Sequence, residues 1–305
     1  MNVLEITDLH KSFGSRSVID GLTLNVPEHA VFGFVGPNGA GKTTTMKMIL
    51  GLLKADRGSI LVCGESVRYG ETKTNRLIGY LPDVPEFYGY MRAREYLTLC
   101  GNITGMKHDA IKAKSAELLS LVGLEDAKQK IGGYSRGMKQ RLGIAQALLN
   151  EPKLLICDEP TSALDPLGRK EILDILSAVK GKTTVLFSTH ILSDVERVCD
   201  HVAVLGSGTL RLNGTLSEIR AQHRHNGFTL EFATEEDADR FASDERLKAP
   251  GLTLLREART LTLHIADPAQ RGGFVIAILE AQHLVPTKLE QLEPTLESLF
   301  LEAVQ

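Results

Sequence analysis

The spacing of apolar residues predicts strands that alternate with helices over the first part of the chain. Apolar and polar residues alternate in 3–9 and 22–26, as in strands with one buried face. The segment 30–36 is instead an apolar run, typical of a strand buried on both faces. Apolar positions at helical spacing follow up to Leu53. This part of the sequence therefore predicts a strand, a glycine-rich loop and a helix in direct succession.

The same alternation returns after a mostly helical stretch at about 92–130. Residues 154–160 and 183–190 are predicted strands, and 168–179 between them has helical spacing. Strands that are joined through helices run parallel and are covered on both faces. The pattern therefore predicts a mostly parallel central sheet, interrupted by a helical insert and closed by a β-hairpin at 201–214.

The pattern changes near residue 227. Period-two alternation and helical spacing now predict the order βαββαβ, which indicates a small α+β domain. The polar residues before it predict a linker with a short helix near Thr215. His223 and His225 in this linker are candidate metal ligands, although two isolated histidines are far more often solvated. We expect one domain over 1–214, a linker over 215–226 and the small domain over 227–305.

Composition narrows the class of protein. The 305 residues are 43% hydrophobic and 24% charged, as in a globular protein, and the net charge of −3 gives no basic field, so no nucleic-acid partner is expected. No apolar stretch approaches the length of about 18 residues that a membrane span needs, and the N-terminus is unlike a signal peptide. The scattered cysteines predict neither zinc nor disulfides but four buried thiols of a cytosolic protein, Cys63, Cys100, Cys157 and Cys199.

The strongest chemical signal is the segment GPNGAGKT at 36–43, which matches the phosphate-loop pattern GxxxxGK[ST]. Glycines let backbone N–H groups surround a phosphate, and the following helix adds the positive end of its dipole. Lys42 is expected to neutralise the β- and γ-phosphates of ATP, and the Thr43 hydroxyl to bind Mg²⁺. The predicted nucleotide-binding residues here are Gly36, Pro37, Asn38, Gly39, Ala40, Gly41, Lys42, Thr43 and Thr44.

Two carboxylates end the predicted strand at 154–160. Because parallel strands end at one edge of a sheet, Asp158 and Glu159 are expected beside the phosphate loop. We assign Asp158 to the magnesium shell and Glu159 to orienting and deprotonating the attacking water. Acidic residues commonly follow strands, so the phosphate loop is what favours the catalytic interpretation.

Three further segments narrow the class of phosphate-loop protein. They are YSRGMKQR at 134–141, SALD at 162–165 and STH at 188–190. In this order and spacing they resemble the signature motif, D-loop and switch histidine of the ATP-binding cassette (ABC) family. The resemblance covers about residues 1–214. It implies a P-loop NTPase domain of the ABC type, with a mostly parallel central sheet, an antiparallel β subdomain and a helical insert at about 84–140.

The resemblance also implies roles for single residues. Ser135 and Gly137 would contact the γ-phosphate bound to a second subunit, and Asp165 would line the dimer contact. His190 would bind the γ-phosphate and help to orient Glu159. Phe13 would stack on adenine. The plainer alternatives are a helix cap for Ser135, a loop histidine for His190 and a packing role for Phe13.

The sequence departs from the commonest ABC pattern in two places. Arg136 replaces the glycine after the signature serine, and Met138 replaces a common glutamine. More seriously, Asp83 stands where the family typically has glutamine. Aspartate can accept bonds from magnesium-bound water but repels a bare phosphate. Asp83 is therefore a candidate magnesium ligand with an open role.

The partner is suggested by two further features. Phe87, Tyr88 and Tyr90 gather next to the helical insert, where the family docks a transmembrane subunit; ordinary core packing is the alternative. The terminal segment 293–304 resembles that of ABC-2-type exporter ATPases, and an amphipathic helix with Leu296, Leu299 and Phe300 is its plainer interpretation. We therefore expect ATP and Mg²⁺ as cofactors, a separate permease, a homodimer or a paired ATPase subunit, and a place at the cytoplasmic face of the cell membrane.

The main rival is a soluble ABC-type ATPase that acts on nucleic acid or ribosomes. A chromosome-maintenance ATPase would carry long heptad helices between Lys42 and Ser135, which are only about ninety residues apart. A translation-factor relative would carry two cassettes, whereas this chain has one phosphate loop. A metabolic kinase would work as a monomer and would not need Ser135.

Overall fold

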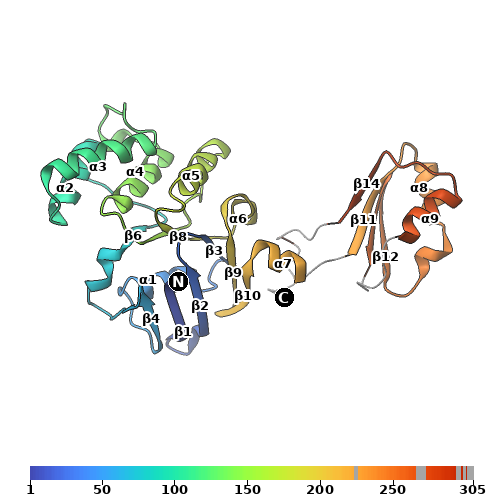
Figure 1. Cartoon of the computed structure of the whole chain (residues 1–305), viewed down its shortest axis with the longest axis horizontal. Coiled ribbons are helices and arrows are strands. Elements are labelled where there is room, and N and C mark those ends of the chain that lie inside the picture. Colours follow the sequence, from blue (N-terminus) through green and yellow to red (C-terminus); the bar gives the residue numbers. More distant parts are fainter. Residues whose placement is uncertain (223–225, 266–272, 293–296, 298–299, 301–305) are drawn as a thin grey trace. The chain divides into compact units, whose positions relative to one another are not determined.

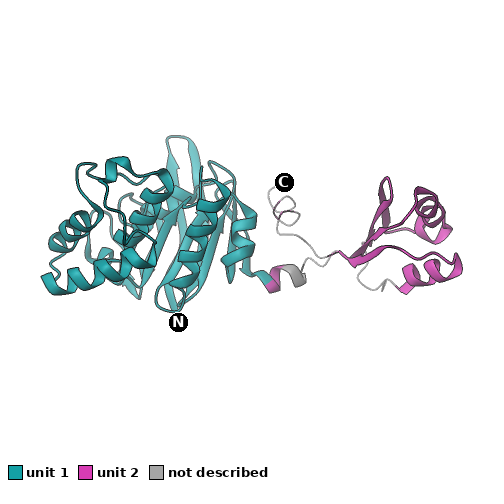
Figure 2. Cartoon of the chain, turned by 90° about the horizontal axis from the view of Figure 1, so that it is seen from above, with its two compact units in different colours: residues 1–216, 303–305 teal, residues 217–302 magenta. Residues whose placement is uncertain are grey.

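The computed structural model describes residues 1–222, 226–265, 273–292, 297 and 300. These residues divide into two compact units, one up to Leu216 and the other from Ser217 onward (Figures 1 and 2). The candidate metal ligands His223 and His225 lie outside the described residues, as does most of the predicted terminal helix, including Leu296 and Leu299.

Two sheets form the framework of the first unit (Figure 1). An antiparallel sheet has the order β2-β1-β4-β5, with β1 Asn2–Phe13, β2 Arg16–Pro27, β4 Arg57–Val62 and β5 Glu65–Ser66. A six-stranded sheet has the order β10-β9-β3-β8-β7-β6, with β3 Val31–Val35, β6 Ile78–Leu81, β7 Leu154–Asp158, β8 Thr184–Thr189, β9 His201–Gly206 and β10 Thr209–Thr215.

In this six-stranded sheet, the neighbouring strands β9, β3, β8, β7 and β6 all pair parallel, and only β10 pairs antiparallel, with β9. This confirms the α/β prediction with a mostly parallel central sheet and a closing hairpin. β3, β7 and β8 are buried at every residue. β3 and most of β7 are therefore continuously apolar, whereas β8 also buries the polar residues Thr184, Ser188 and Thr189.

One hydrophobic core joins the two sheets. Phe32 and Phe34 of β3 pack in it with residues of β1, β2, β4, β7 and β8 and with Met46 of α1, Lys42–Ile49. On the other face of β3, Gly33 lies against Val195 of α6, Leu192–Val198. Both faces of the central sheet are therefore covered, and the loop between β3 and α1 is anchored at both ends in buried structure.

Three helices lie between β6 and β7 in the sequence and form the insert. They are α2 Ala93–Ile103, α3 His108–Leu121 and α4 Arg136–Leu148, with a short 3₁₀ helix at Ile131–Gly133 before α4 and another at Lys73–Leu77 before β6. β6 and β7 are neighbours in the sheet, with Ile78 opposite Leu154. The insert therefore leaves and re-enters the sheet at adjacent strands, and α4 begins close to the ends of both.

Polar caps fix the starts of the helices that border the site. The Ser135 hydroxyl accepts a hydrogen bond from Met138 N at 3.2 Å at the start of α4. Asp165 accepts one from Gly168 N at 3.3 Å at the start of α5, Pro166–Ala178, whose first residue is proline. The plainer interpretation of Ser135 as a cap is thus confirmed, and a cap leaves room for a second role. The next helix, α7 Leu216–Gln222, begins at the boundary between the two units.

The second unit has the predicted order βαββαβ. Its antiparallel sheet has the order β12-β13-β11-β14, and α8 and α9 pack against it. Phe232 and Phe241 lie in its core, with ring centroids 5.6 Å apart. The elements are β11 Asn226–Glu231, α8 Glu235–Ala242, a 3₁₀ helix at Glu245–Lys248, β12 Leu252–Glu257, β13 Thr260–Ile265, α9 Gly273–Ala281 and β14 Lys288–Gln291.

Candidate functional site

The loop that joins β3 to α1 needs glycine for steric reasons. A Cβ on Gly36 would lie 2.5 Å from the Leu205 carbonyl oxygen. Gly41 has φ +107°, and a Cβ there would lie 2.4 Å from Cδ1 of Ile19. Glycine is therefore required at both positions, and the loop can approach a ligand with backbone N–H groups alone.

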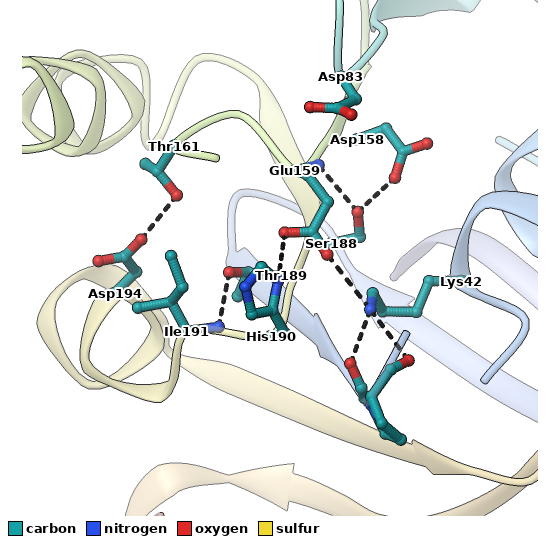
Figure 3. A network of polar contacts seen from close by, with 12 residues as sticks. Lys42, Asp83, Asp158, Glu159, Thr161, Ser188, Thr189, His190, Ile191 and Asp194 are labelled. Atoms are coloured by element: carbon teal, nitrogen blue, oxygen red, sulfur yellow. Dashed lines mark hydrogen bonds and ion pairs between the residues drawn. The ribbon is translucent and has the colours of Figure 1, made fainter. Parts of the chain in front are cut away.

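Lys42 is the first residue of α1, and its side chain folds back over this loop (Figure 3). Its Nζ donates to the Gly36 carbonyl oxygen at 2.6 Å and lies 3.2 Å from Oε1 of Glu159. Only 6% of Lys42 is exposed. The ammonium group is thus held in a partly desolvated position between the loop and a carboxylate, where its charge acts strongly on an anion.

The loop, the acidic residues and the first hairpin enclose one cavity of about 390 Å³. Its lining combines backbone donors, one lysine and three carboxylates. The lining residues are Arg16, Val18, Pro37, Asn38, Gly39, Gly41, Lys42, Thr43, Thr44, Asp83, Asp158 and Glu159. Gly36 and Ala40 shape the loop from behind: Gly36 accepts from Lys42, and Ala40 N donates to the Pro37 carbonyl oxygen at 3.2 Å.

Ser188 fixes the two acidic residues relative to each other. It lies opposite Asp158 in the pairing of β7 with β8 and is fully buried. Its hydroxyl donates to Oδ1 of Asp158 at 2.6 Å and accepts from Glu159 N at 3.0 Å (Figure 3). Glu159 has φ +47°, a left-handed conformation that costs a non-glycine residue about 1–3 kcal/mol and that clusters at functional sites.

His190 follows directly after β8 and reaches the same carboxylate. Its Nδ1 lies 3.0 Å from Oε2 of Glu159 (Figure 3). The Glu159 side chain is mostly buried, whereas the His190 side chain is half-exposed. One side of the imidazole is therefore held by Glu159 while part of the ring remains accessible.

Asp83 follows β6, the neighbour of β7 in the sheet, and lines the same cavity as Asp158. Its carboxylate Oδ1 lies 3.4 Å from Nη2 of Arg136, and its carbonyl oxygen accepts from Gln140 Nε2 at 2.7 Å. Burial raises the pKa of the Asp83 carboxyl, Arg136 lowers it, and the nearby charges of Asp158 and Glu159 raise it further. The net pKa is above its ordinary value.

Seven of the predicted site residues do not line this cavity, as far as the described residues define it. Gly36 and Ala40 lie behind the loop, His190 reaches the site only through Glu159, and the other four are Phe13, Ser135, Gly137 and Asp165. Phe13 is 52% exposed at the end of β1, with Nζ of Lys11 5.3 Å from its ring centroid. A Cβ on Gly137 would meet only Leu164, at 3.9 Å. The space next to the start of α4 is therefore open on this chain.

Comparison with known proteins identifies the family. The family model described as ABC transporter matches residues 19–162. The chain is 39% identical to the uncharacterized ABC transporter ATP-binding protein YxlF of Bacillus subtilis, over 99% of both chains. The chain belongs to the ABC transporter ATP-binding proteins. It is an ATP-hydrolysing subunit, and the predicted α/β fold of the ABC type is confirmed.

Other relatives of this ATPase subunit are named for antibiotics. The bacitracin transport ATP-binding protein BcrA of Bacillus licheniformis is 42% identical, over 75% of this chain and 74% of its own. The daunorubicin/doxorubicin resistance ATP-binding protein DrrA of Streptomyces peucetius is 34% identical, over 98% and 91%. A solved structure titled as the ATP binding subunit of an ABC transporter shares 35% identity with a TM-score of 0.65, over 72% of this chain and 92% of that one.

The cavity of the ATPase subunit fits a triphosphate with a divalent cation. Nucleotide binding explains the glycine loop and the buried ammonium of Lys42. For Mg²⁺, Thr43 and Asp158 are the fitting donors, since this ion is usually held by one or two carboxylates together with substrate phosphates. In the described parts of the chain, no three His, Cys, Asp or Glu side chains form a cluster that could hold a metal ion without a ligand.

The sequence did not predict three parts of the site. Arg16 and Val18 line the cavity wall, and the Ser188 hydroxyl links Asp158 to Glu159 through hydrogen bonds. The Ser188 role depends on the register of β7 against β8, which no local pattern encodes. The cysteine prediction was wrong in part. All four thiols are free, but only Cys157 is buried, and Cys100 and Cys199 are partly buried. Cys63 is exposed, because it lies in the turn between β4 and β5 rather than in a core strand.

Within the described ranges, none of the helices has the length and apolar character needed to cross a membrane.

Proposed function

We propose that this ATPase subunit powers export across a membrane through a separate permease. The names of BcrA and DrrA, which refer to transport of and resistance to antibiotics, support this class of process. The observation that carries the proposal is a groove next to the nucleotide cavity that shares Asp83 with it. A partner bound there would touch the same segment as the nucleotide site.

The groove has a volume of about 470 Å³ and combines apolar and basic residues. It is lined by Asp83, Val84, Pro85, Glu86, Phe87, Gly89, Ile131, Gly132, Arg136 and Lys139. Of the neighbouring aromatic residues, Phe87 packs edge-on against Tyr96 at 5.1 Å, whereas Tyr88 and Tyr90 are 54% and 69% exposed. Phe87 is thus partly buried against Tyr96, and the two exposed tyrosines are available to a helix of the permease.

In the proposed reaction, Lys42 and the loop glycines hold the triphosphate, with Mg²⁺ at Thr43, Asp158 and Asp83. Mg²⁺ would neutralise charge that develops on the phosphates. Glu159 takes the proton of the attacking water, and His190 orients Glu159 and binds the γ-phosphate. Phe13 stacks on the adenine.

Two copies complete the site in this proposal. Ser135 and Gly137 at the start of α4 bind the γ-phosphate held by the partner protomer, and Asp165 lines the contact. The open space beside Gly137 and the N–H groups at this helix start suit an anion. We assign the nucleotide chemistry to 1–214 and treat 227–305 as an accessory domain joined through 215–226, at the cytoplasmic face of the membrane.

Co-purification tests the export proposal. The tagged full-length chain is expressed in its native cells, extracted from membranes in mild detergent, and its companions are identified. A multi-spanning protein encoded as a separate chain should be recovered. The variant Tyr88→Ser/Tyr90→Ser should lose it, whereas Tyr69→Ser, which changes an exposed tyrosine elsewhere on the first unit, should retain it. Recovery of ribosomes or DNA in place of a membrane protein would instead support the soluble rival.

A further inference from the structure

Asp83 lies in the wall between two hollows of the first unit. It lines the nucleotide cavity together with Lys42 and Asp158, and it lines the neighbouring groove together with Arg136. Its side chain is 47% exposed. A short, partly exposed carboxylate at this position can therefore turn toward either hollow.

The main chain of Asp83 is held while its carboxylate is free to turn. Gln140, which is fully buried on α4, donates from Nε2 to the Asp83 carbonyl oxygen at 2.7 Å. This bond fixes the position of the residue relative to α4. Among the residues that the structure describes, the carboxylate is held only by Arg136, over 3.4 Å and near solvent, which is a weak pair of the surface kind.

On the cavity side, Asp83 faces two further carboxylates. The charges of Asp158 and Glu159 act against its ionisation, and Arg136 acts for it. Three carboxylates at one cavity need cations. Nζ of Lys42 forms an ion pair with Oε1 of Glu159 at 3.2 Å, and Arg136 forms one with Asp83. A divalent cation beside Asp158 would offer Asp83 a second positive partner, on the side away from Arg136.

We propose that Arg136 and Mg²⁺ compete for the Asp83 carboxylate, so that Arg136 sets how strongly nucleotide binding depends on Mg²⁺. This inference rests on the proposed function, in which Mg·ATP binds at Lys42. Turning toward Asp158 takes the short Asp83 side chain away from Arg136. Even without such a turn, the guanidinium charge weakens the attraction of the carboxylate for a cation. Arg136 is thus a positioning residue that acts through Asp83.

The competition concerns two of the three residues at which the sequence departs from the commonest family pattern. Neither Asp83 nor Arg136 is the uncharged residue expected there, and the structure pairs them with each other. The aspartate adds a negative charge to the cavity, and the arginine offsets it from the groove side. The two departures compensate for each other electrostatically.

The test is the Mg²⁺ dependence of nucleotide affinity. The Kd of the full-length chain for a non-hydrolysable fluorescent ATP analogue is measured with EDTA and with saturating Mg²⁺. The Kd in EDTA divided by the Kd in Mg²⁺ is the ratio that is compared between variants, and a larger ratio means a stronger dependence on Mg²⁺. Arg136→Gln should raise this ratio by about two- to five-fold, the range of an exposed ion pair. Arg136→Lys, which restores the charge, should return it toward the wild-type value.

Two matched variants make the test specific. Lys139→Gln removes a cation from the same helix and groove, and in the described part of the chain this lysine forms no ion pair; its ratio should stay at the wild-type value. In an Asp83→Asn background, Arg136→Gln should no longer change the ratio. An unchanged ratio in Arg136→Gln, an equal rise in Lys139→Gln, or a rise that persists with Asn at position 83 would each overturn the inference. Failure of the wild-type chain to bind the analogue would instead overturn the proposed function.

Discussion

Nδ1 of His190 lies 3.0 Å from Oε2 of Glu159, although the two residues are 31 positions apart. The other oxygen of this carboxylate lies 3.2 Å from Nζ of Lys42. A single carboxylate group thus connects the phosphate-loop lysine with the histidine after β8. A group in this position can accept a proton from water at the γ-phosphate while a neighbour on each side fixes its direction.

Replacing Glu159 with glutamine should stop hydrolysis but not binding. The amide keeps the size of the side chain but is not a base, so ATP turnover should fall by about 10²–10⁴-fold while ATP affinity stays within a few-fold. ATP hydrolysis assays and size-exclusion chromatography with ATP measure both effects, and an ATP-held dimer should accumulate. Glu171→Gln on α5, outside the cavity, is the control. Near-normal turnover in Glu159→Gln would remove Glu159 from its role.

Replacing His190 with alanine should act through the same carboxylate. Turnover should fall by about 10²-fold or more, because Glu159 loses its orienting partner and the phosphate loses a donor. In the Glu159→Gln background the same substitution should add little, since residues that work as a unit are not additive. Single-turnover assays of the two single variants and the double variant check this. Additive losses would show that His190 acts independently of Glu159.

Replacing Ser188 with alanine should lower both stability and turnover. The change removes a buried hydroxyl that donates to Asp158 and accepts from Glu159 N. Unfolding free energy should fall by about 1–3 kcal/mol, and turnover should fall with it. The matched control is Thr183→Val, which removes a buried hydroxyl bonded to the Pro152 carbonyl oxygen before the other end of β8. That control should lose stability alone. If the two variants lose turnover to the same degree, Ser188 has only a structural role.

Much of this site was predictable from the sequence because its motifs are local. The glycine loop and the carboxylates at the end of β7 are read from adjacent residues, and hydrophobic periodicity places each motif at the end of a strand. The contacts of Ser188 and the pairing of Asp83 with Arg136 were not predictable. They depend on the register of β7 and β8 and on where the insert returns to the sheet, and both are set by packing over the whole unit.

The aromatic residues after Asp83 had two interpretations in the sequence, core packing and a docking surface, and the structure divides the residues between burial and exposure. Phe87 packs on Tyr96, whereas Tyr90 is largely exposed. Period and composition do not separate these cases, because burial here is decided by helices of the insert rather than by neighbours in sequence.

Asp194 should give stability a measurable pH dependence. Its carboxyl is buried and accepts from the Thr161 hydroxyl at 2.7 Å, and burial raises its pKa above the ordinary value of 3.8. The folded state therefore binds this proton more tightly than the unfolded state does. The resulting stabilisation is present below pH 3.8 and is lost as the pH rises through the folded-state pKa. Asp194→Asn should remove this loss.

Thermal unfolding from about pH 4 to pH 7 measures this effect. The melting temperature of Asp194→Asn relative to wild type should rise across the lower part of this range and then level off. Glu151→Gln is the comparison, since Lys114 lowers the pKa of the exposed Glu151 carboxyl and should give the opposite slope. A constant difference between Asp194→Asn and wild type at every pH would contradict the assignment.

Mixed dimers test most directly whether Lys42 of one protomer and Ser135 of its partner form one site. Lys42→Ala and Ser135→Arg should each be inactive when assayed alone. When the two variants are mixed, each mixed dimer holds one site with both residues intact, so ATP hydrolysis should reappear and grow with the fraction of mixed dimers. Failure of mixing to restore hydrolysis, together with full activity of monomeric wild-type chain, would contradict a composite site.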